Sequence, residues 1–397
     1  MIFVYYSFAV LLIYFSYKSF RGGFEYLNFF RQELAKPRSD FTPFCSIIAP
    51  CKGLDHDLEK NLQALFEQDF PNYEIVFVVD SETDEALSVI KNIHRRDAET
   101  QRISKIVISG KAENEAQKVH NLREAILHVA DESEVFVFVD SDARPNKDWL
   151  RNLIAPLQDE KIGCASGYRW FISKSFSLAT EMRSVWNASI ASALGANIKG
   201  NFCWGGSMAI RREIFEKLNM HEKWRGVLSD DFAMTRAMNE ANLPIYHVPQ
   251  SLTASVENCT FAQMLEFTTR QMKITRVYGT KFWVMSFIGS GLFNLVMLTS
   301  FLLLIFDILF WFPLTTILLV SIFSIGKSWL RLNAVKLILK DYERELSRQF
   351  WMQNTLWLFA PPLFFYNCVC ALLSRKIVWR GIKYELKSPT ETVIISQ

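Results

Sequence analysis

Two aspartates separated by one residue follow a short apolar run. Residues 135–139 read Val-Phe-Val-Phe-Val, which is typical of a strand buried on both faces of a parallel sheet. Asp140 and Asp142 come next, at the strand end where open α/β sheets place their ligands. Both carboxylates can reach one hard cation, Mn2+ or Mg2+. The pattern predicts a metal-bound nucleotide diphosphate, or simply a polar turn that closes a strand.

Further acids stand where apolar runs end or helices begin. Asp80 follows the predicted strand 74–79, a position at which carboxylates contact a base or a ribose; its other reading is a turn or capping residue. Asp230 and Asp231 open a helix predicted to end near residue 241. One acid suffices for capping, so the second can act as a general base toward an attacking hydroxyl.

Several cations complete the set of candidate residues. Lys118, on a helix predicted over 115–130, can meet a phosphate or remain a solvated surface lysine. Arg270 and Lys273 can face a diphosphate leaving group or anionic lipid heads, although basic residues before a membrane helix also mark topology. Trp379 and Arg380 lie in a stretch too aromatic and too basic for an arbitrary tail.

The elements that position these residues alternate regularly. Apolar runs and amphipathic segments give βαβαβαβ, which indicates an α/β fold with a doubly wound, largely parallel sheet. Right-handed crossovers then bring the strand ends to one edge. The predicted strands cover 45–50, 74–79, 104–108, 135–139 and 162–171, and the predicted helices cover 57–68, 84–96, 115–130 and 176–195. The last helix either lies at a bilayer surface or packs in an ordinary core.

Hydrophobic residues make up 50% of the chain, with 33 Phe, and the excess is concentrated in three apolar stretches, 2–17, 282–325 and 355–373. Basic residues follow each stretch, which predicts a cytoplasmic catalytic domain in a multi-pass membrane protein. The predicted segments are a transmembrane anchor (1–20), a basic linker (21–42), an α/β domain (43–280), a transmembrane helical hairpin (281–326), an amphipathic surface helix (327–350), a third membrane segment that spans or re-enters (351–374) and a basic tail (375–397).

Charge and cysteine content exclude some function classes. The net charge of +3 is too small to indicate nucleic acid as a partner. The seven cysteines show neither a CxxC pair nor a zinc-type spacing with histidine, so free thiols in a reducing compartment are expected.

Taken in order, these motifs resemble the inverting, metal-dependent glycosyltransferases of family 2 type, which have a GT-A fold, and above all the ceramide glucosyltransferase group and its bacterial relatives. The resemblance covers nearly the whole chain. It rests on Lys52-Gly53, Asn61-Leu62, Pro71-x-Tyr73-Glu74, Asp80, Asp140-Ser141-Asp142, Asp231 and Trp379-Arg380-Gly381-x-x-Tyr384-x-Leu386.

The resemblance implies a role for each matching residue. Asp231 is expected to be the catalytic base with Asp230 beside it, and Arg270 and Lys273 to assist the leaving group. Asp140 and Asp142 are expected to hold Mn2+ or Mg2+. The nucleotide sugar, most simply a UDP-sugar, is expected to contact Asp80, Lys52, Lys118, Asp140, Trp379 and Arg380.

The expected reaction is the transfer of one sugar to a lipid hydroxyl. One departure from the family pattern is visible: Arg/Gln-x-x-Arg-Trp appears here as Arg270-Gln271-Met272-Lys273-Ile274. The charge is kept, but Ile274 lacks the aromatic surface of Trp, which argues against a processive polysaccharide synthase. Two alternatives remain open, transfer to a polyprenyl phosphate and a catalytically silent membrane protein that binds a nucleotide sugar or lipid.

Overall fold

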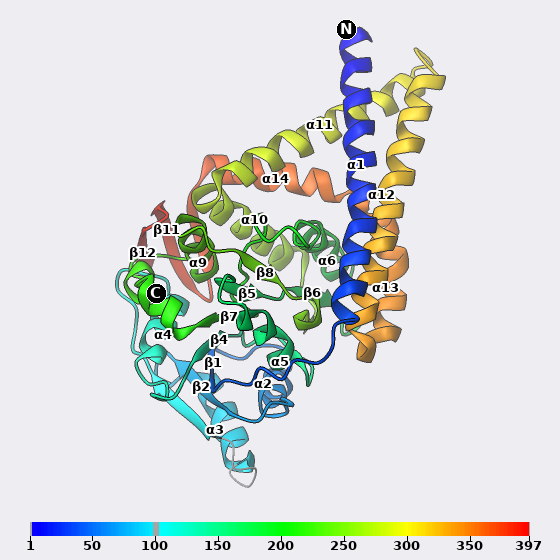
Figure 1. Ribbon diagram of the computed structural model, residues 1–397. Helices are drawn as coiled ribbons and strands as arrows, with labels where there is room; N and C mark the ends of the chain where they lie inside the picture. Colours follow the sequence, from blue (N-terminus) through cyan, green and yellow to red (C-terminus); the bar gives the residue numbers. More distant parts are fainter. Residues whose placement is uncertain (1, 98–102, 397) are drawn as a thin grey trace. The chain divides into compact units, whose positions relative to one another are not determined.

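The computed structural model describes residues 2–97 and 103–396 (Figure 1). The chain forms two compact units, each assembled from separated segments. The helical unit comprises Met1–Gln32, Ser175–Ser192 and Asn258–Ser374. The sheet unit comprises Glu33–Lys174, Ala193–Glu257 and Arg375–Gln397.

A seven-stranded mixed sheet with the order β3-β2-β1-β4-β7-β5-β8 forms the centre of the sheet unit. The first four strands in that order are mutually parallel, whereas β7 runs antiparallel to both β4 and β5. The strands are β1 (Cys45–Pro50), β2 (Tyr73–Val79), β3 (Ile103–Ile108), β4 (Val135–Phe138), β5 (Cys164–Ser166), β7 (Met208–Arg211) and β8 (Ile245–His247). Every residue of β1, β2 and β4 is buried, including Ser46 and Glu74, as predicted for strands of a parallel sheet.

Helices connect these strands and cover the sheet (Figure 1). They are α2 (Leu58–Phe66), α3 (Glu85–Asp97), α4 (Gln117–Ile126), α5 (Trp149–Ile154), α7 (Arg212–Lys217), α8 (Met220–Lys223) and α9 (Asp230–Glu240), with short 3-10 turns η2 (Ala155–Gln158) and η3 (Pro249–Ser251). The predicted α/β class, a doubly wound mixed sheet, is confirmed. The sequence offers Asp55 or Asp57 as the cap of the helix predicted over 57–68. Asp57 stands at the N-cap of α2 with a left-handed backbone and makes no side-chain cap hydrogen bond, so a capping role for Asp57 is wrong.

One predicted strand proves to be two. Residues 162–171 divide into β5 and β6 (Arg169–Ile172), and β6 pairs with β9 (Thr253–Val256) in a separate two-stranded sheet. Gly167 lies at the break. A Cβ there would fall 2.2 Å from the Ser251 carbonyl oxygen, so only glycine permits this close approach.

The predicted basic tail is an antiparallel sheet of β10 (Lys376–Trp379), β11 (Ile382–Ser388) and β12 (Glu391–Ser396). Its first hairpin turns at Arg380 and Gly381, whose φ angles are 51° and 80°. Two positive φ values suit the two-residue turn that matches the twist of a hairpin. The turn therefore fixes where Arg380 stands.

The helical unit contains α1 (Ile2–Leu34), α6 (Leu178–Ala191), α10 (Phe261–Tyr278), α11 (Thr280–Ile305), α12 (Trp311–Ile338), α13 (Glu343–Thr355) and α14 (Ala360–Leu373), with 3-10 turns η4 (Lys340–Tyr342) and η5 (Leu356–Leu358). By length and composition α1, α11 and α12 could each cross a membrane. The segments Lys340–Leu358 and Ala360–Leu373 could together form a fourth span bent by 60°. The two prolines of α14 fall in its first turn, which tolerates them.

The boundaries of two helices and of the sheet unit differ from the prediction. Helix α1 continues to Leu34 through the expected linker, since Gly23 packs closely on Leu330 of α12 rather than breaking the helix. Helix α12 continues to Ile338, so 327–350 is not one surface helix but the end of α12, the turn η4 and the start of α13. Residues 175–192 and 258–280 group with the helical unit rather than with the sheet. Trp186 of α6 is buried there and stacks on Phe364, which is core packing.

Candidate active site

A chain of ion pairs joins three aspartates at the carboxyl end of β4. Lys118 of α4 places its Nζ 2.8 Å from Asp140 Oδ1 and 3.0 Å from Asp230 Oδ1. Arg169 of β6 continues the chain, with 2.9 Å to Asp142 Oδ2 and 3.5 Å to Asp140 Oδ2. The structure therefore brings together Lys118, the Asp140–Asp142 motif and Asp230, which come from three separate parts of the sequence.

The pKa values in this chain follow from burial and from the opposing charges. Burial alone would raise the pKa of Asp142, but Arg169 and Arg380 outweigh it and hold that pKa below its usual range. Burial would lower the pKa of Lys118, yet Asp140, Asp230 and Asp231 raise it instead. Asp142 and Lys118 are therefore both charged at neutral pH.

Asp231 lies beside this chain on the first turn of α9. Its Oδ2 accepts a hydrogen bond from the Gly205 amide at 3.4 Å, and its Oδ1 accepts from the Phe232 amide at 2.7 Å. The Ser229 hydroxyl also donates to Oδ1. Unlike Asp230, which is 2% exposed, Asp231 remains partly accessible. It is thus the acid of the pair that a substrate can reach.

Two glycines let the backbone pass directly against these carboxylates. A Cβ on Gly205 would lie 2.2 Å from Asp230 Oδ2 and 2.9 Å from Lys118 Nζ, and one on Gly206 would lie 2.8 Å from Asp140 Oδ2. The backbone of Gly205 and Gly206 therefore lies between the Asp231 and Asp140 carboxylates and is close to both. The sequence Trp204-Gly205-Gly206-Ser207-Met208 predicts such a close approach of the backbone, although to a ligand.

Replacing Gly205 with alanine should displace the Asp230 carboxylate from Lys118. We expect a loss of about 1–3 kcal/mol in the free energy of unfolding. Thermal unfolding measures it, with Gly195→Ala as the matched control because no atom lies within 4 Å of a Cβ at that position. Equal effects of the two substitutions would contradict the crowding inferred at Gly205.

Ionisation of Asp230 should make stability depend on pH. Burial, with the neighbouring Asp231 and Asp140, raises its pKa from 3.8 to about 6. Since the folded pKa exceeds the unfolded one, the group's contribution to stability is complete below pH 4 and is lost as pH rises through 6. The unfolding temperature of the wild type should therefore fall relative to that of Asp230→Asn as pH rises from 5 to 8. A pH-independent difference would exclude this assignment.

Asp80 and Lys52 form a second charged pair. Lys52 follows β1, Asp80 follows β2, and their side chains make a direct ion pair. Strand β1 lies between β2 and β4 in the sheet, so at about 4.8 Å per strand the ends of β2 and β4 are about 10 Å apart. This spacing places Asp80 along the same sheet edge as Asp140, as the strand pattern predicts.

Arg380 reaches this edge from the turn between β10 and β11. Its guanidinium pairs with Asp55, and Asp55 Oδ2 accepts a hydrogen bond from the Ser141 hydroxyl at 2.6 Å. The middle residue of the Asp140–Asp142 motif is thereby tied to Asp55. Trp379 ends β10 and is partly buried.

Arg270 and Lys273 lie on α10 in the helical unit. Arg270 makes an ion pair with Glu266 at 3.5 Å and lies over the Phe267 ring. Burial lowers the pKa of Lys273. Their expected role toward a leaving group stays a prediction.

Sequence reasoning missed Arg169 and gave Asp55 only a capping role. Arg169 is buried, and its guanidinium lies 4.7 Å from the Trp204 ring centroid. A signal was available in the sequence, since an arginine between Tyr168 and Trp170 in an apolar strand requires a buried acidic partner.

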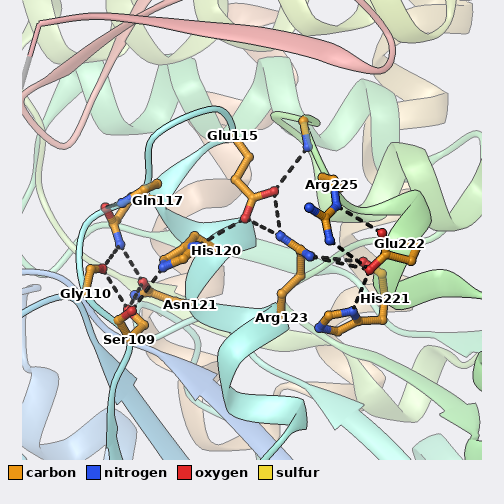
Figure 2. Close-up of polar contacts among 12 residues, drawn as sticks. Ser109, Gly110, Glu115, Gln117, His120, Asn121, Arg123, His221, Glu222 and Arg225 are labelled. Carbon is orange, nitrogen blue, oxygen red and sulfur yellow. Dashed lines mark hydrogen bonds and ion pairs between the residues drawn. The ribbon is translucent and has the colours of Figure 1, made fainter.

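A second polar cluster fixes the helix that carries Lys118 (Figure 2). Glu115 lies at its centre, 2.7 Å from Arg123 Nη1 and 3.1 Å from His120 Nδ1, and accepts a hydrogen bond from the Gly226 amide at 3.1 Å. The side chain of Gln117 bonds to Gly110 and Asn121 on the other side. The cluster therefore holds the N-terminal turns of α4 in place from two sides.

Replacing Glu115 with glutamine should remove the near carboxylate of the buried Arg123 guanidinium and leave only Glu222, 3.8 Å away. Breaking such a pair costs about 3–5 kcal/mol, so we expect a marked fall in the unfolding temperature. Glu113→Gln is the matched control, because Glu113 is exposed two residues away. Equal unfolding temperatures for the two variants would mean that this cluster contributes little.

Asp140 and Asp142 suit a hard cation because one of their carboxylate oxygens has no partner in the protein. Asp142 Oδ1 is buried and has no hydrogen-bond partner, so it presents a free carboxylate oxygen beside Asp140. Within residues 2–97 and 103–396, no group of three or more His, Cys, Asp or Glu is arranged to hold a metal ion. The residues therefore fit a cation that takes two protein carboxylates and draws its other oxygens from elsewhere.

Comparison with known proteins gives a family and more distant relatives. The family profile described as Glycosyl transferase family 21 matches residues 9–392. A ceramide glucosyltransferase of Komagataella phaffii is 32% identical over 78 residues, which cover 20% of this chain and 15% of that protein. Ceramide glucosyltransferase 1 of Caenorhabditis elegans is 23% identical over 199 residues, which cover 49% of this chain and 42% of that protein. In both cases the match spans less than half of the relative.

Solved structures show weaker likeness. The mannosyltransferase PcManGT from Pyrobaculum calidifontis, solved with GDP-Man and Mn2+, is 18% identical with a TM-score of 0.43, covering 91% of this chain and 98% of that one. GalNAc-T7, solved with UDP, GalNAc and Mn2+, is 15% identical with a TM-score of 0.40, covering 55% and 44%.

Proposed function

Because this chain belongs to glycosyl transferase family 21, we propose that it moves one sugar from a nucleotide diphosphate sugar to a lipid hydroxyl with inversion at the anomeric carbon. The observation that carries the proposal is the ion-pair chain Asp230–Lys118–Asp140–Arg169–Asp142 at the carboxyl ends of the strands. Charged side chains in such number at that edge are suited to a charged ligand.

The nucleotide sugar, in our proposal a UDP-sugar, binds along this edge. Asp80 accepts hydrogen bonds from the nucleoside, and Lys52, whose ion pair with Asp80 supports a shared role, contacts the nucleotide as well. Lys118 and Arg380 are the cations that turn toward the diphosphate. Trp379, next to Arg380 in the β10–β11 hairpin, offers an aromatic face to the same ligand.

Asp140 and Asp142 are the residues that would hold Mn2+ or Mg2+, and the free Asp142 Oδ1 supports this. A bound cation neutralises charge that develops on the leaving diphosphate. The remaining charge compensation comes from the protein. Lys118 is held between Asp140 and Asp230, so the buried Asp230 positions Lys118 for that task. Arg270 and Lys273 are proposed to assist the leaving group in the same way.

Asp231 is the proposed general base. Its carboxylate takes the proton of the acceptor hydroxyl while that oxygen bonds to the anomeric carbon and the bond to the diphosphate breaks. Hydrogen bonds from the Gly205 and Phe232 amides hold the carboxylate. A single displacement of this kind inverts the anomeric carbon, which is the reason for proposing inversion.

The acceptor is proposed to be a ceramide-like, sterol-like or diacylglycerol-like lipid with a free hydroxyl. The relatives named ceramide glucosyltransferase and the helices able to cross a membrane support a lipid acceptor. Basic residues follow the predicted spans, including Lys18, Arg21 and Arg31 after the first, which favours a cytoplasmic sheet unit.

A screen of nucleotide sugars tests the function. The full chain in membranes is incubated with each UDP- or GDP-sugar, total membrane lipid and Mn2+ or Mg2+, and products are identified by mass spectrometry. We expect one glycosylated neutral lipid, with the product absent for Asp140→Ala. Hydrolysis without a lipid product, or no reaction with any donor, would reject the proposed transfer.

A further inference from the structure

Helix α12 carries two cations one turn apart inside the helical unit. Lys327 and Arg331 are four residues apart, so their side chains lie on the same face. Arg331 stands about 30 Å along the helix from Trp311 at 1.5 Å per residue, and about 30 Å is the thickness of the hydrocarbon layer. If α12 crosses the membrane, as its length and composition allow, Arg331 falls at the depth of the lipid phosphates of one leaflet.

Helix α1 runs side by side with α12 (Figure 1), and its residues line one side of the space around Lys327. The two helices run parallel, because the aromatic ring of Tyr5 contacts that of Phe312 and, further along both helices, the ring of Tyr17 contacts that of Phe323. Lys327 Nζ donates to the Ser19 hydroxyl at 2.7 Å. A Cβ on Gly326 would fall 2.5 Å from the Phe20 ring, so the two helices are closely packed just beside Lys327.

Arg331 is buried among neutral groups. It is 4% exposed, and its two long hydrogen bonds reach Ser192 Oγ at 3.4 Å and Gln353 Oε1 at 3.3 Å. Its Nε has no hydrogen-bond partner. Over residues 2–97 and 103–396, neither Lys327 nor Arg331 forms an ion pair with a carboxylate. A guanidinium buried in this way is costly unless an anion compensates it.

We propose that Lys327 and Arg331 bind the phosphate of an anionic lipid between α1, α6, α12 and α13. A phosphate presents several oxygens and suits the planar donors of arginine, including its free Nε. Lys327 is only partly buried, so a ligand can reach the pair from the Lys327 side. Ser19, Ser192 and Gln353 supply the neutral polar lining. Phosphate binding here does not depend on sugar transfer.

The test compares two lipids that differ only in the phosphate. The full chain is purified in a phosphate-free, uncharged detergent, and its unfolding temperature is measured with dioleoyl phosphatidic acid, with dioleoylglycerol and with inorganic phosphate. Phosphatidic acid at about a hundredfold excess over its dissociation constant should raise the temperature by about 3 °C or more. Dioleoylglycerol should not. A shift with inorganic phosphate alone would assign the same site to a soluble phosphate.

Arg331→Gln should abolish the lipid-dependent shift, whereas Lys340→Gln, which removes one exposed charge from the following turn η4, should keep it. Without lipid, Arg331→Gln should unfold at the same temperature as the wild type or higher, because a buried charge is removed. A merely structural arginine would instead lower it. The proposal fails if wild type shows no phosphate-dependent shift, or if Arg331→Gln retains it. Neither result bears on the transfer reaction, since catalysis is not measured.

Discussion

Asp231→Asn is expected to lower kcat for sugar transfer by about 10²–10⁴-fold, the usual contribution of a general base. Asparagine is nearly isosteric, and its side-chain oxygen can still accept a hydrogen bond from the Phe232 amide, which now bonds to Oδ1 at 2.7 Å. The substitution thus removes the basic group and leaves the local geometry in place. Donor affinity, measured by titration with the nucleotide sugar, should change by less than about threefold.

The matched control is Glu240→Gln at the other end of α9. Glu240 pairs with Arg236 and Lys223 on the surface, where ion pairs contribute about 0–1 kcal/mol. Its kcat should stay within about twofold of wild type. If Asp231→Asn retained most of the wild-type rate, the role of base would have to be withdrawn.

The size of this effect also separates the acceptor classes. A lipid hydroxyl must lose its proton during attack, so its transfer depends on a base. A polyprenyl phosphate is already anionic, and Asp231→Asn should then cost less than about tenfold. A catalytically silent protein would bind the nucleotide sugar with the same affinity in wild type and variant and release no product from either.

Much of the sheet unit was predictable because its central strands are rich in β-branched and aromatic residues. Strands β1, β2 and β4 are buried on both faces, so their sequences do not alternate between apolar and polar residues, and the ends of β2 and β4 are marked by the next acid. Asp80 and Asp140 were located in this way. Their common sheet edge follows from parallel order and right-handed connections alone.

The partners of these acids were less predictable, since they come from other elements. Arg169 reaches Asp142 only because Gly167 lets the chain leave β5 and begin β6, and close contact with Ser251 cannot be seen in a single sequence. Arg380 reaches Asp55 from the turn of a hairpin. Ile382, Tyr384 and Leu386 alternate with polar residues as in a half-buried strand, but this alternation does not show which residue the turn contacts. Long-range pairings of this kind depend on tertiary packing.

Removing divalent cations should abolish transfer, and Asp142→Asn should weaken cation binding by at least about tenfold. Asp142 Oδ1 is buried without a partner, so it is the oxygen most available to a cation. Burial would favour the neutral acid, yet Arg169 and Arg380 keep the pKa of Asp142 low, and the carboxylate is ionised at neutral pH. An amide in its place keeps the shape but loses the charge that Mn2+ or Mg2+ requires.

The decisive measurement does not need activity. After chelation, Mn2+ should raise the unfolding temperature of wild type together with UDP, and Asp142→Asn should show a much smaller rise at the same concentrations. Asp148→Asn, an exposed acid six residues away, should behave as wild type. An alternative arrangement leaves Arg169 and Lys118 to neutralise the diphosphate without a metal. In that case the chelated protein would retain full transfer activity, Mn2+ would stabilise neither protein, and Asp142 would serve only to hold Arg169.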